Sequence, residues 1–436
     1  MPTREFGNLR RYTNRSSGAD NDIFLRQKPP DAMSESKPDT KPSANLAIRL
    51  GLRIIADIAS VTNHARKHAM TVVKCLTPAM GTHPVKCRCG EVMAEPNACR
   101  QRFCPLCCGP RLTRFLFAWS KRFLLVDHFH LVFTLPHEVN LLWMLNPAKM
   151  GDILFKAVSI TIKTLMADPQ WCGAQPGFVC FLQTWSNELK HHPHLHVILT
   201  AGGVGLNGIW IAMRRGEDFA IPHEVISDMF QKVFTRLLKD AMEEDDDDFR
   251  IPSYWNPRKV RKFLKALDKK AFVVWITGAY ASPMGILRYL AQYAVAGPVP
   301  NSKMVAVNKK TVTFLMQPRP DLAELKKTLT LEEFLERYLQ HIPPQGFHIV
   351  RGYGLYSATC KLKATDLPEQ PVATDERPMM PMIFQEDLPI DEPYRCPACR
   401  AVFATAKTMR IHRRGGYRRV IAKKPTDRAG PLASVA

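Results

Sequence analysis

The side chains with the clearest chemical potential are four histidines within the six-residue run HHPHLH at 191–196. His194 and His196 flank a single leucine and lead directly into an apolar run. In a strand, residues i and i+2 point to the same face, so both imidazoles would stand on one face about 7 Å apart. Two such imidazoles are neighbouring ligands for a divalent cation that could polarise a phosphodiester. A solvated cluster of surface histidines is the alternative interpretation.

A second reactive group is the tyrosine pair Tyr289 and Tyr293, in the segment GILRYLAQYA whose composition predicts a helix. Residues i and i+4 share a helix face, so the two hydroxyls would lie about 6 Å apart. A tyrosine oxygen can attack a phosphodiester and hold the DNA end covalently, provided that a nearby cation stabilises the transition state. Two such tyrosines could cleave and exchange two strands. Considered without the histidines, a tyrosine pair at this spacing is also explained by packing of both side chains in the hydrophobic core.

Close pairs of cysteines predict a metal site of another kind. Cys87–Cys89 and Cys104–Cys107 are separated by about 15 residues, as in a zinc ribbon, where four thiolates close a tetrahedral structural site. The first pair is C-x-C rather than C-x-x-C, so Cys99, Cys108 and His83 remain alternative ligands. Arginines around the module make it a candidate DNA-contacting surface: Arg88, Arg100, Arg102 and Arg111.

A smaller cysteine module near the C-terminus has three of the four ligands of a Cys₂His₂ finger. Cys396 and Cys399 are followed after twelve residues by His412, and no second histidine follows at finger spacing. We expect a candidate second zinc site here, followed by a basic tail that adds salt-sensitive affinity for DNA.

Composition points to a polyanionic partner. The 436 residues include 61 Lys and Arg against 40 Asp and Glu, a formal net charge of +21, which is typical of nucleic-acid-binding proteins. We find no apolar run long enough to span a membrane and no apolar signal core near residue 1. We therefore expect a cytoplasmic, nucleoid-associated bacterial protein whose twelve cysteines serve as thiolate ligands.

The pattern of elements favours an α+β fold, because strands and helices alternate irregularly. We expect a disordered arm at 1–44, a helical segment and zinc ribbon at 45–125, and at 126–360 the domain that holds the histidine and tyrosine pairs. A Pro- and acid-rich linker at 361–393 precedes the C-terminal module at 394–436. Helices are expected at 45–74, 111–123, 153–165, 254–270, 284–295 and 331–341. Strands are expected at 128–136, 177–185, 194–200, 272–276, 304–308 and 311–316.

Taken together and in this order, these stretches resemble the two-tyrosine HUH transposases of the insertion sequence 91 family, which move DNA by a rolling-circle route. The resemblance runs from about residue 85 to 357. It is carried by NACRQRFCPLC at 97–107, FHLVFTLP at 129–136, TW at 184–185, HPHLH at 192–196, GG at 202–203, RYLAQY at 288–293 and GFHIVRGYG at 346–354.

This resemblance implies an HUH-type antiparallel sheet with flanking helices, preceded by a small zinc ribbon. The histidine pair would lie on a central strand beside the tyrosine helix. By analogy, His194 and His196 bind Mg²⁺ or Mn²⁺, and Tyr289 and Tyr293 form 5′-phosphotyrosine links. Such an enzyme cleaves and rejoins single-stranded DNA at transposon ends and in target DNA.

The chain departs from the family pattern around these residues. The first cysteine pair is shortened. Gln183 stands where the family often has His, and its amide oxygen could be the third ligand of the ion; Glu188 is the rival. After Tyr293 the chain reads AVAGPVP, without the basic residue expected there.

Two further sets of residues have open roles. His128 and His130 form a second HxH pair, for which we expect a structural role although it is the rival metal pair. Arg351, close in sequence to His348, is a candidate phosphate contact. Two other functions also remain open: a non-catalytic zinc-module DNA-binding protein, and a rolling-circle plasmid initiator or relaxase. The zinc module ahead of the histidine strand favours the transposase.

Overall fold

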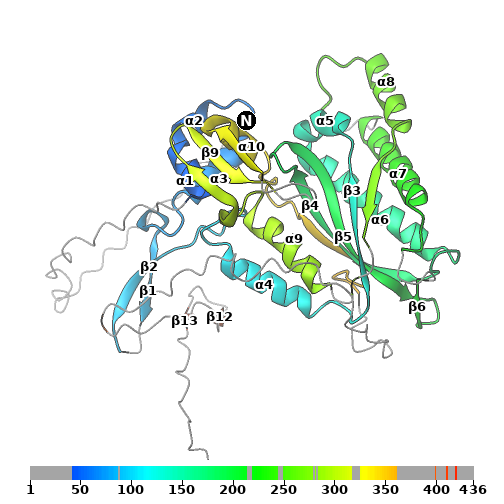
Figure 1. Ribbon diagram of the computed structural model, residues 1–436, viewed down its shortest axis with the longest axis horizontal. Helices are drawn as coiled ribbons and strands as arrows, with labels where there is room; N and C mark the ends of the chain where they lie inside the picture. The colour runs from blue at the N-terminus through cyan, green and yellow to red at the C-terminus, as the bar shows by residue number, and fades with distance from the viewer. Residues whose placement is uncertain are drawn as a thin grey trace, which may run out of the picture. The chain divides into compact units, whose positions relative to one another are not determined.

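The computed structural model describes residues 42–86, 89–213, 219–243, 249–277, 280, 283–316 and 325–360, together with 398, 409–410 and 418–419. The expected arm up to residue 41, the linker at 361–393 and the ligands Cys396, Cys399 and His412 lie outside these residues. Within the described residues the predicted α+β class is confirmed, since helices alternate with antiparallel sheets (Figure 1). None of the described helices is both long and apolar enough to cross a membrane.

The largest sheet places β5 at its centre. Its strands run in the order β11-β4-β5-β3-β7, every pairing is antiparallel, and β6 pairs with the end of β5. The long strands β4 and β5 are buried on both faces, which accounts for their nearly continuous apolar sequences. The bounds are β3 (His128–Thr134), β4 (Gln175–Trp185), β5 (His191–Val204), β6 (Trp210–Ala212), β7 (Val273–Ile276) and β11 (Val350–Gly354).

Side chains of this sheet alternate between two cores. Phe178 and Cys180 belong to the core that contains residues of α6 and α7, whereas Val179 and Phe181 belong to the core formed with α4 and α9. The helices are α4 (Gly109–Ser120), α5 (Asn140–Leu145), α6 (Pro147–Ala167), α7 (His223–Glu243), α8 (Pro257–Asp268) and α9 (Met284–Ala296). The sheet is therefore covered on both faces, and α9, the predicted tyrosine helix, crosses β4 and β5 on one of them (Figure 1).

A second, smaller antiparallel sheet follows α9 and packs with helices from the other end of the described chain. It consists of β8 (Met304–Val307), β9 (Thr311–Leu315) and β10 (Lys326–Thr330), followed by α10 (Leu331–Leu339). The helices α1 (Ala44–Leu50), α2 (Leu52–Asp57) and α3 (Asn63–Val72) lie against α10 (Figure 1). Residues separated by more than 200 positions in sequence thus build one cluster.

The single helix expected at 45–74 is in fact three. Gly51 separates α1 from α2 at a point where a Cβ would come within 2.1 Å of Leu335 Cδ1, so a larger residue there would have to displace this side chain of α10. The chain leaves the helix again at Ile58, and Thr62 caps α3 through a hydrogen bond from the Ala65 amide to its hydroxyl. Hydrophobic periodicity alone does not show such interruptions.

The segment between α3 and α4 is a hairpin with cysteines at its base. Strands β1 (Thr82–Lys86) and β2 (Val92–Pro96) pair in antiparallel register. The Leu76 amide donates to the Asn97 carbonyl at 3.1 Å, which joins the two ends of the hairpin. Among the last described residues, β12 (Met409–Arg410) pairs with β13 (Arg418–Arg419).

Candidate functional site

The histidine pair lies on β5 at the centre of the main sheet, on the face that α9 covers. His194 and His196 are each 8% exposed, and their ring centroids are 4.9 Å apart. Burial lowers the pKa of His194 to about 4 and that of His196 well below its usual value. Both imidazoles are therefore neutral at pH 7, which is the form that binds a metal ion.

Each of these imidazoles already uses its Nδ1 atom. His194 Nδ1 lies 2.6 Å from the carbonyl of His192, and His196 Nδ1 lies 2.9 Å from His130 Nε2. A ligating histidine typically donates its other ring N–H to such a partner, which fixes the tautomer and the ring orientation. With Nδ1 as the donor, Nε2 of both His194 and His196 keeps its lone pair for a cation.

The third predicted ligand stands beside the pair. Gln183 on β4 is directly opposite His194 in the antiparallel register and is 7% exposed. Its Nε2 atom is buried and has no hydrogen-bond partner among the described residues. Amide oxygen and nitrogen are assigned from their hydrogen bonds, so exchanging them would place the oxygen at this unsatisfied position. The buried amide thus fits a third ligand.

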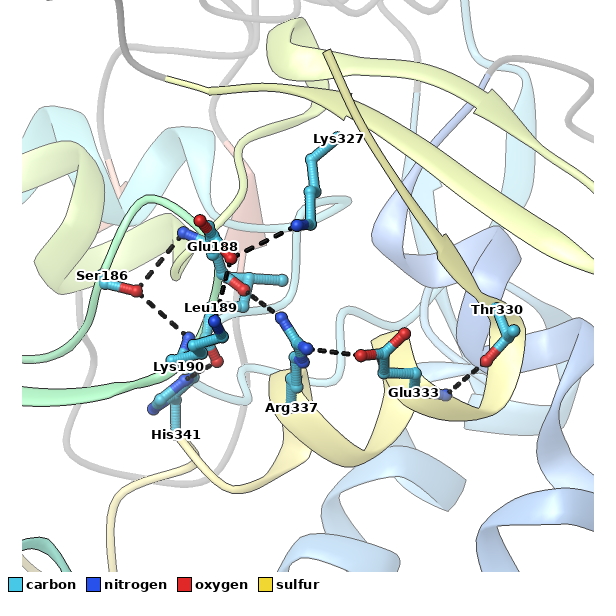
Figure 2. A network of polar contacts seen from close by, with 9 residues as sticks. All are labelled: Ser186, Glu188, Leu189, Lys190, Lys327, Thr330, Glu333, Arg337 and His341. Carbon is cyan, nitrogen blue, oxygen red and sulfur yellow. Dashed lines mark hydrogen bonds and ion pairs between the residues drawn. The ribbon is translucent and has the colours of Figure 1, made fainter. Parts of the chain in front are cut away.

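Glu188, the rival ligand, is held in a different way. It lies in the turn between β4 and β5, where Lys190 and Lys327 each approach its carboxylate to 3.2 Å (Figure 2). Hydrogen bonds from Lys190 and Lys327 lower the pKa of this carboxyl group. Because two lysines already neutralise the carboxylate, Gln183 is the better-placed ligand for a cation at the histidines.

The same turn is clamped by α10, as Figure 2 shows. Arg337 Nη1 donates to the Glu188 carbonyl at 2.8 Å, and His341 Nε2 lies 3.1 Å from the Leu189 carbonyl. Leu189 has a φ of 61°, an uncommon conformation for a leucine, so the surrounding contacts must hold it. Since this turn joins the strands that carry Gln183 and His194, the clamp helps to set their register.

Both tyrosines of α9 face the histidines. The Tyr289 ring centroid lies 6.5 Å from that of His196 and 5.1 Å from that of Tyr293. Tyr293 is 6% exposed, and burial, followed by the neighbouring Tyr289, raises the pKa of its phenol. One cavity of about 540 Å³ is lined by residues from β4, β5 and α9: Gln183, His194, His196, Tyr289 and Tyr293. The structure therefore brings together all five residues predicted for this site.

The two histidines of the second HxH pair, on β3, contact different residues. His128 is fully buried, and its Nε2 lies 2.6 Å from the Tyr356 hydroxyl, with the two rings stacked. His130 instead contacts His196, as described above. These contacts agree with the expected structural role of His128 and give His130 a supporting position next to the candidate ion site.

Four buried thiols form a separate cluster at the base of the β1–β2 hairpin. The sulfurs of Cys75, Cys99, Cys104 and Cys107 all lie within 4.8 Å of one another. Cys99 Sγ and Cys107 Sγ are 3.7 Å apart, close to the edge of about 3.8 Å expected for a tetrahedron with Zn–S bonds of about 2.3 Å. Hydrogen bonds from the neighbouring thiols, that of Cys104 first, lower the pKa of Cys107, which favours the thiolate form that binds zinc. The donor set fits a structural zinc ion.

This geometry favours a different ligand set from Cys87, Cys89, Cys104 and Cys107. Cys104 and Cys107 are in the cluster together with Cys99, which was an alternative ligand, and Cys75, which was not predicted. Cys89 is exposed in the hairpin turn, and Cys87 lies outside the described residues. At the base of the hairpin, by contrast, the Cys99 amide donates to Cys75 Sγ at 3.4 Å.

Comparison with known proteins identifies the family. Residues 50–135 match the transposase zinc-binding domain of insertion sequence 91 type, and residues 177–363 match a family model described as "putative transposase". A Sinorhizobium fredii protein described as "putative transposase y4qJ" is 30% identical over 381 residues, which are 84% of this chain and 94% of that protein. The chain belongs to the insertion sequence 91 family of transposases.

A second relative of this transposase is the transposase for insertion sequence element IS801 of Pseudomonas savastanoi pv. phaseolicola. It is 24% identical over 295 residues, which are 65% of this chain and 68% of that protein. No solved structure matches the transposase.

The predicted DNA-contacting arginines of the transposase occupy different surroundings. Arg111 Nη1 donates to the carbonyls of Arg100 at 3.1 Å and Gln101 at 2.5 Å, so it braces the cysteine loop. Arg102 is half-buried, and burial lowers the pKa of its guanidinium. Arg100 is exposed, and Arg88 lies outside the described residues. Contact with DNA stays a prediction for these residues.

Arg351 is separated from the histidine pair. It is opposite Cys180 on β11, on the sheet face that packs against α6, and its Nη2 lies 2.5 Å from Asp152 Oδ1. His194 and His196 lie on the other face. The structure therefore gives no support for a contact between Arg351 and a phosphate bound at the histidines.

Sequence reasoning missed three residues at these sites. Cys75 stands alone in sequence, His130 was assigned to a rival pair, and Lys303 lies ten residues beyond Tyr293 although its Nζ lies 3.5 Å from the Tyr293 hydroxyl. The sequence did contain a signal for Cys75: a hairpin between Cys75 and Cys99 would bring these two cysteines together. No local pattern marks the other two, since strand pairing and chain reversal place them.

Proposed function

We propose that this transposase cleaves and rejoins single-stranded DNA at transposon ends through 5′-phosphotyrosine links to Tyr289 and Tyr293. Mg²⁺ or Mn²⁺ would be held by His194, His196 and Gln183. The observation that carries this proposal is the common cavity, which gathers two neutral imidazoles, an unsatisfied buried amide and two phenols. A purely structural role in the hydrophobic core would not explain why these polar groups line one cavity.

The residues of the chain fit a divalent ion. The Nδ1 partners of both histidines leave Nε2 as the donor atom, and the Gln183 amide offers the third. When bound, the ion supplies Lewis-acid polarisation of the scissile phosphate. Two imidazoles and an amide carry no charge, so the ion keeps its full charge to offset that of the phosphodiester.

Of the two tyrosines, Tyr289 lies in ring contact with His196 and is the better placed to attack a phosphate held at the histidines. Its oxygen forms a bond to phosphorus, the bond to the 3′-oxygen breaks, and a 3′-hydroxyl leaves. The energy of the phosphodiester is kept in the new ester, so a later 3′-hydroxyl can reverse the step and join strands. Rejoining requires that the DNA end stays attached, which the covalent link ensures.

A single strand suits this cavity. The histidines are 8% exposed and Tyr293 6%, so a phosphate must enter a recess in order to reach them. A flexible single strand can bend into such a recess, whereas a stiff duplex would first have to open. The formal charge of +21 supplies affinity for phosphates that does not depend on sequence.

The zinc module is joined to the tyrosine helix, which supports a role in presenting DNA to the cavity. The Phe103 amide donates to the Val295 carbonyl at 3.2 Å, near the end of α9, and the Tyr338 hydroxyl donates to the Phe103 carbonyl at 3.0 Å. Gly297 ends α9 with a φ of 99°, and a Cβ there would come within 2.8 Å of Phe103 Cβ. DNA bound by the module would therefore lie close to α9.

The decisive experiment tests for the covalent link. The full-length protein is incubated with Mg²⁺ or Mn²⁺ and labelled single-stranded DNA from candidate ends, and denaturing gels are scored for a protein–DNA adduct. We expect an adduct that disappears when Tyr289→Phe and Tyr293→Phe are combined. An adduct that survives in this double variant would exclude both tyrosines.

A matched variant separates chemistry from binding. Combining His194→Ala with His196→Ala should abolish the adduct and change DNA affinity little, because binding rests on many phosphate contacts and the ion acts on the transition state. A wild-type protein that binds these DNA ends but forms no adduct with any of them would instead favour a non-catalytic DNA-binding protein.

A further inference from the structure

Lys303 reaches the candidate site from the segment that follows the tyrosine helix. The chain leaves α9 at Gly297, passes through Pro298 and Pro300, and forms the short 3₁₀ helix η3 (Asn301–Lys303). Lys303 lines the same cavity as the histidines and tyrosines. Lys303 therefore brings a positively charged group into this cavity.

Its ammonium group contacts one tyrosine in particular. Lys303 Nζ lies 3.5 Å from the Tyr293 hydroxyl, to which it donates, and 5.9 Å from the centroid of the Tyr293 ring. Such a hydrogen bond is long, as catalytic hydrogen bonds often are before substrate binds. Tyr289, by contrast, has its ring contact with His196.

The surroundings of Tyr293 make a cation necessary if it is to react. It is 6% exposed, and burial raises the pKa of its phenol, with a further contribution from Tyr289. A phenolate developing at this position has little access to water, so a fixed positive charge is the means of stabilising it.

We propose that different cations stabilise the negative charge that develops when each tyrosine reacts. The ion at the histidines acts in the reaction of Tyr289, and the ammonium group of Lys303 acts in the reaction of Tyr293. This inference rests on the proposed function. The bond between the Tyr293 oxygen and phosphorus forms as the bond to the 3′-oxygen breaks, and the phenol proton passes through water in the cavity to that departing oxygen, which leaves as a 3′-hydroxyl. Lys303 remains protonated throughout and stabilises the phenolate, both when Tyr293 attacks and when it leaves.

Single-tyrosine backgrounds make this assignment testable. In Tyr289→Phe protein only Tyr293 can form the adduct, and there Lys303→Met should lower the rate of adduct formation about 100-fold. In Tyr293→Phe protein only Tyr289 reacts, and the same Lys303→Met change should alter the rate less than about threefold. Mass spectrometry of the digested adduct confirms which tyrosine carries the nucleotide. Lys303→Arg, which keeps the charge, should restore most of the Tyr293 reaction.

Controls distinguish this role from a general effect of charge or of folding. Lys309→Met removes the same charge from the exposed β8–β9 turn and should leave both single-tyrosine reactions unchanged. Melting temperature and affinity for single-stranded DNA are measured for every variant. Equal losses in both backgrounds on Lys303→Met would overturn the assignment, because they would show a general phosphate contact.

Two further outcomes would also count against it. If Tyr293 forms no adduct with Lys303 intact while Tyr289 does, Tyr293 is not a nucleophile and the inference is wrong although the proposed function stands. If neither single-tyrosine protein nor the wild type forms an adduct, the proposed function fails and the inference fails with it.

Discussion

His130 Nε2 lies 2.9 Å from His196 Nδ1, and the two imidazole rings are stacked with an angle of 16° between their planes. The two residues lie on neighbouring strands, since β3 and β5 pair directly, and both are buried. Burial lowers the pKa of His130 to about 4, so it is neutral and can accept the proton of His196 Nδ1. His130 is therefore placed to orient a candidate metal ligand, as a positioning residue.

The first prediction concerns this positioning. His130→Phe keeps a flat ring but removes the hydrogen bond, and it should weaken Mn²⁺ binding and adduct formation about 10- to 100-fold. Calorimetric titration with Mn²⁺ measures the affinity. His128→Phe is the matched control, because it removes the bond to Tyr356 and should lower the melting temperature without changing Mn²⁺ affinity. Unchanged Mn²⁺ affinity in the His130 variant would contradict the prediction.

The second prediction tests which cysteines bind zinc. Cys75→Ser should release zinc and lower the melting temperature, because the other three thiols no longer close a tetrahedral site. Cys89→Ser, at an exposed position in the same module, should keep one zinc per cluster. Zinc content is measured by atomic emission after dialysis. Zinc loss in the Cys89 variant with retention in the Cys75 variant would restore the original assignment.

The third prediction is a dependence of stability on pH. Burial lowers the pKa of His128 and of His341 to about 3 in the folded protein. The unfolded chain binds protons at these positions below its ordinary pKa of about 6.5, and the folded chain does not, so stability is lost as pH falls from about 6.5 towards 3. By pH 4 each such histidine would cost up to about 3 kcal/mol. Urea midpoints between pH 7.5 and 5 should fall, and less steeply in His128→Gln. A flat profile would contradict the assignment.

The fourth prediction separates two polar contacts in the turn between β4 and β5. Arg337→Met removes a charged hydrogen bond to the Glu188 carbonyl, together with the ion pair to Glu333 on the same helix. It should cost about 1–2 kcal/mol and speed amide exchange in residues 186–190. Lys327→Met removes an ion pair whose partners are each about one third exposed, and should cost less than about 1 kcal/mol. Equal effects of both changes would mean that α10 does not clamp the turn.

Periodicity along the chain was enough to predict the chemical groups and the elements that carry them. The i, i+2 spacing of His194 and His196 and the i, i+4 spacing of Tyr289 and Tyr293 are local properties of a strand and a helix, and both pairs occupy one cavity. Short apolar runs likewise predicted the strands that became β3, β4 and β5 to within a few positions. The helix α7 was not predicted although its buried residues Ile226, Phe230, Phe234 and Leu238 recur every four positions, whereas the five-residue strand β11, with two glycines, has no strong local pattern.

Pairing between distant segments decided the rest. Cys75 joins the thiol cluster because a hairpin returns the chain to it, and His130 became the partner of His196 because β3 lies next to β5. Lys303 reaches Tyr293 because Gly297 and the prolines after it turn the chain back on α9. The sequence by itself determined which side chains share a face of one element, since backbone geometry sets that spacing. Only the tertiary structure decided which of those faces meet, because that depends on how the whole core packs.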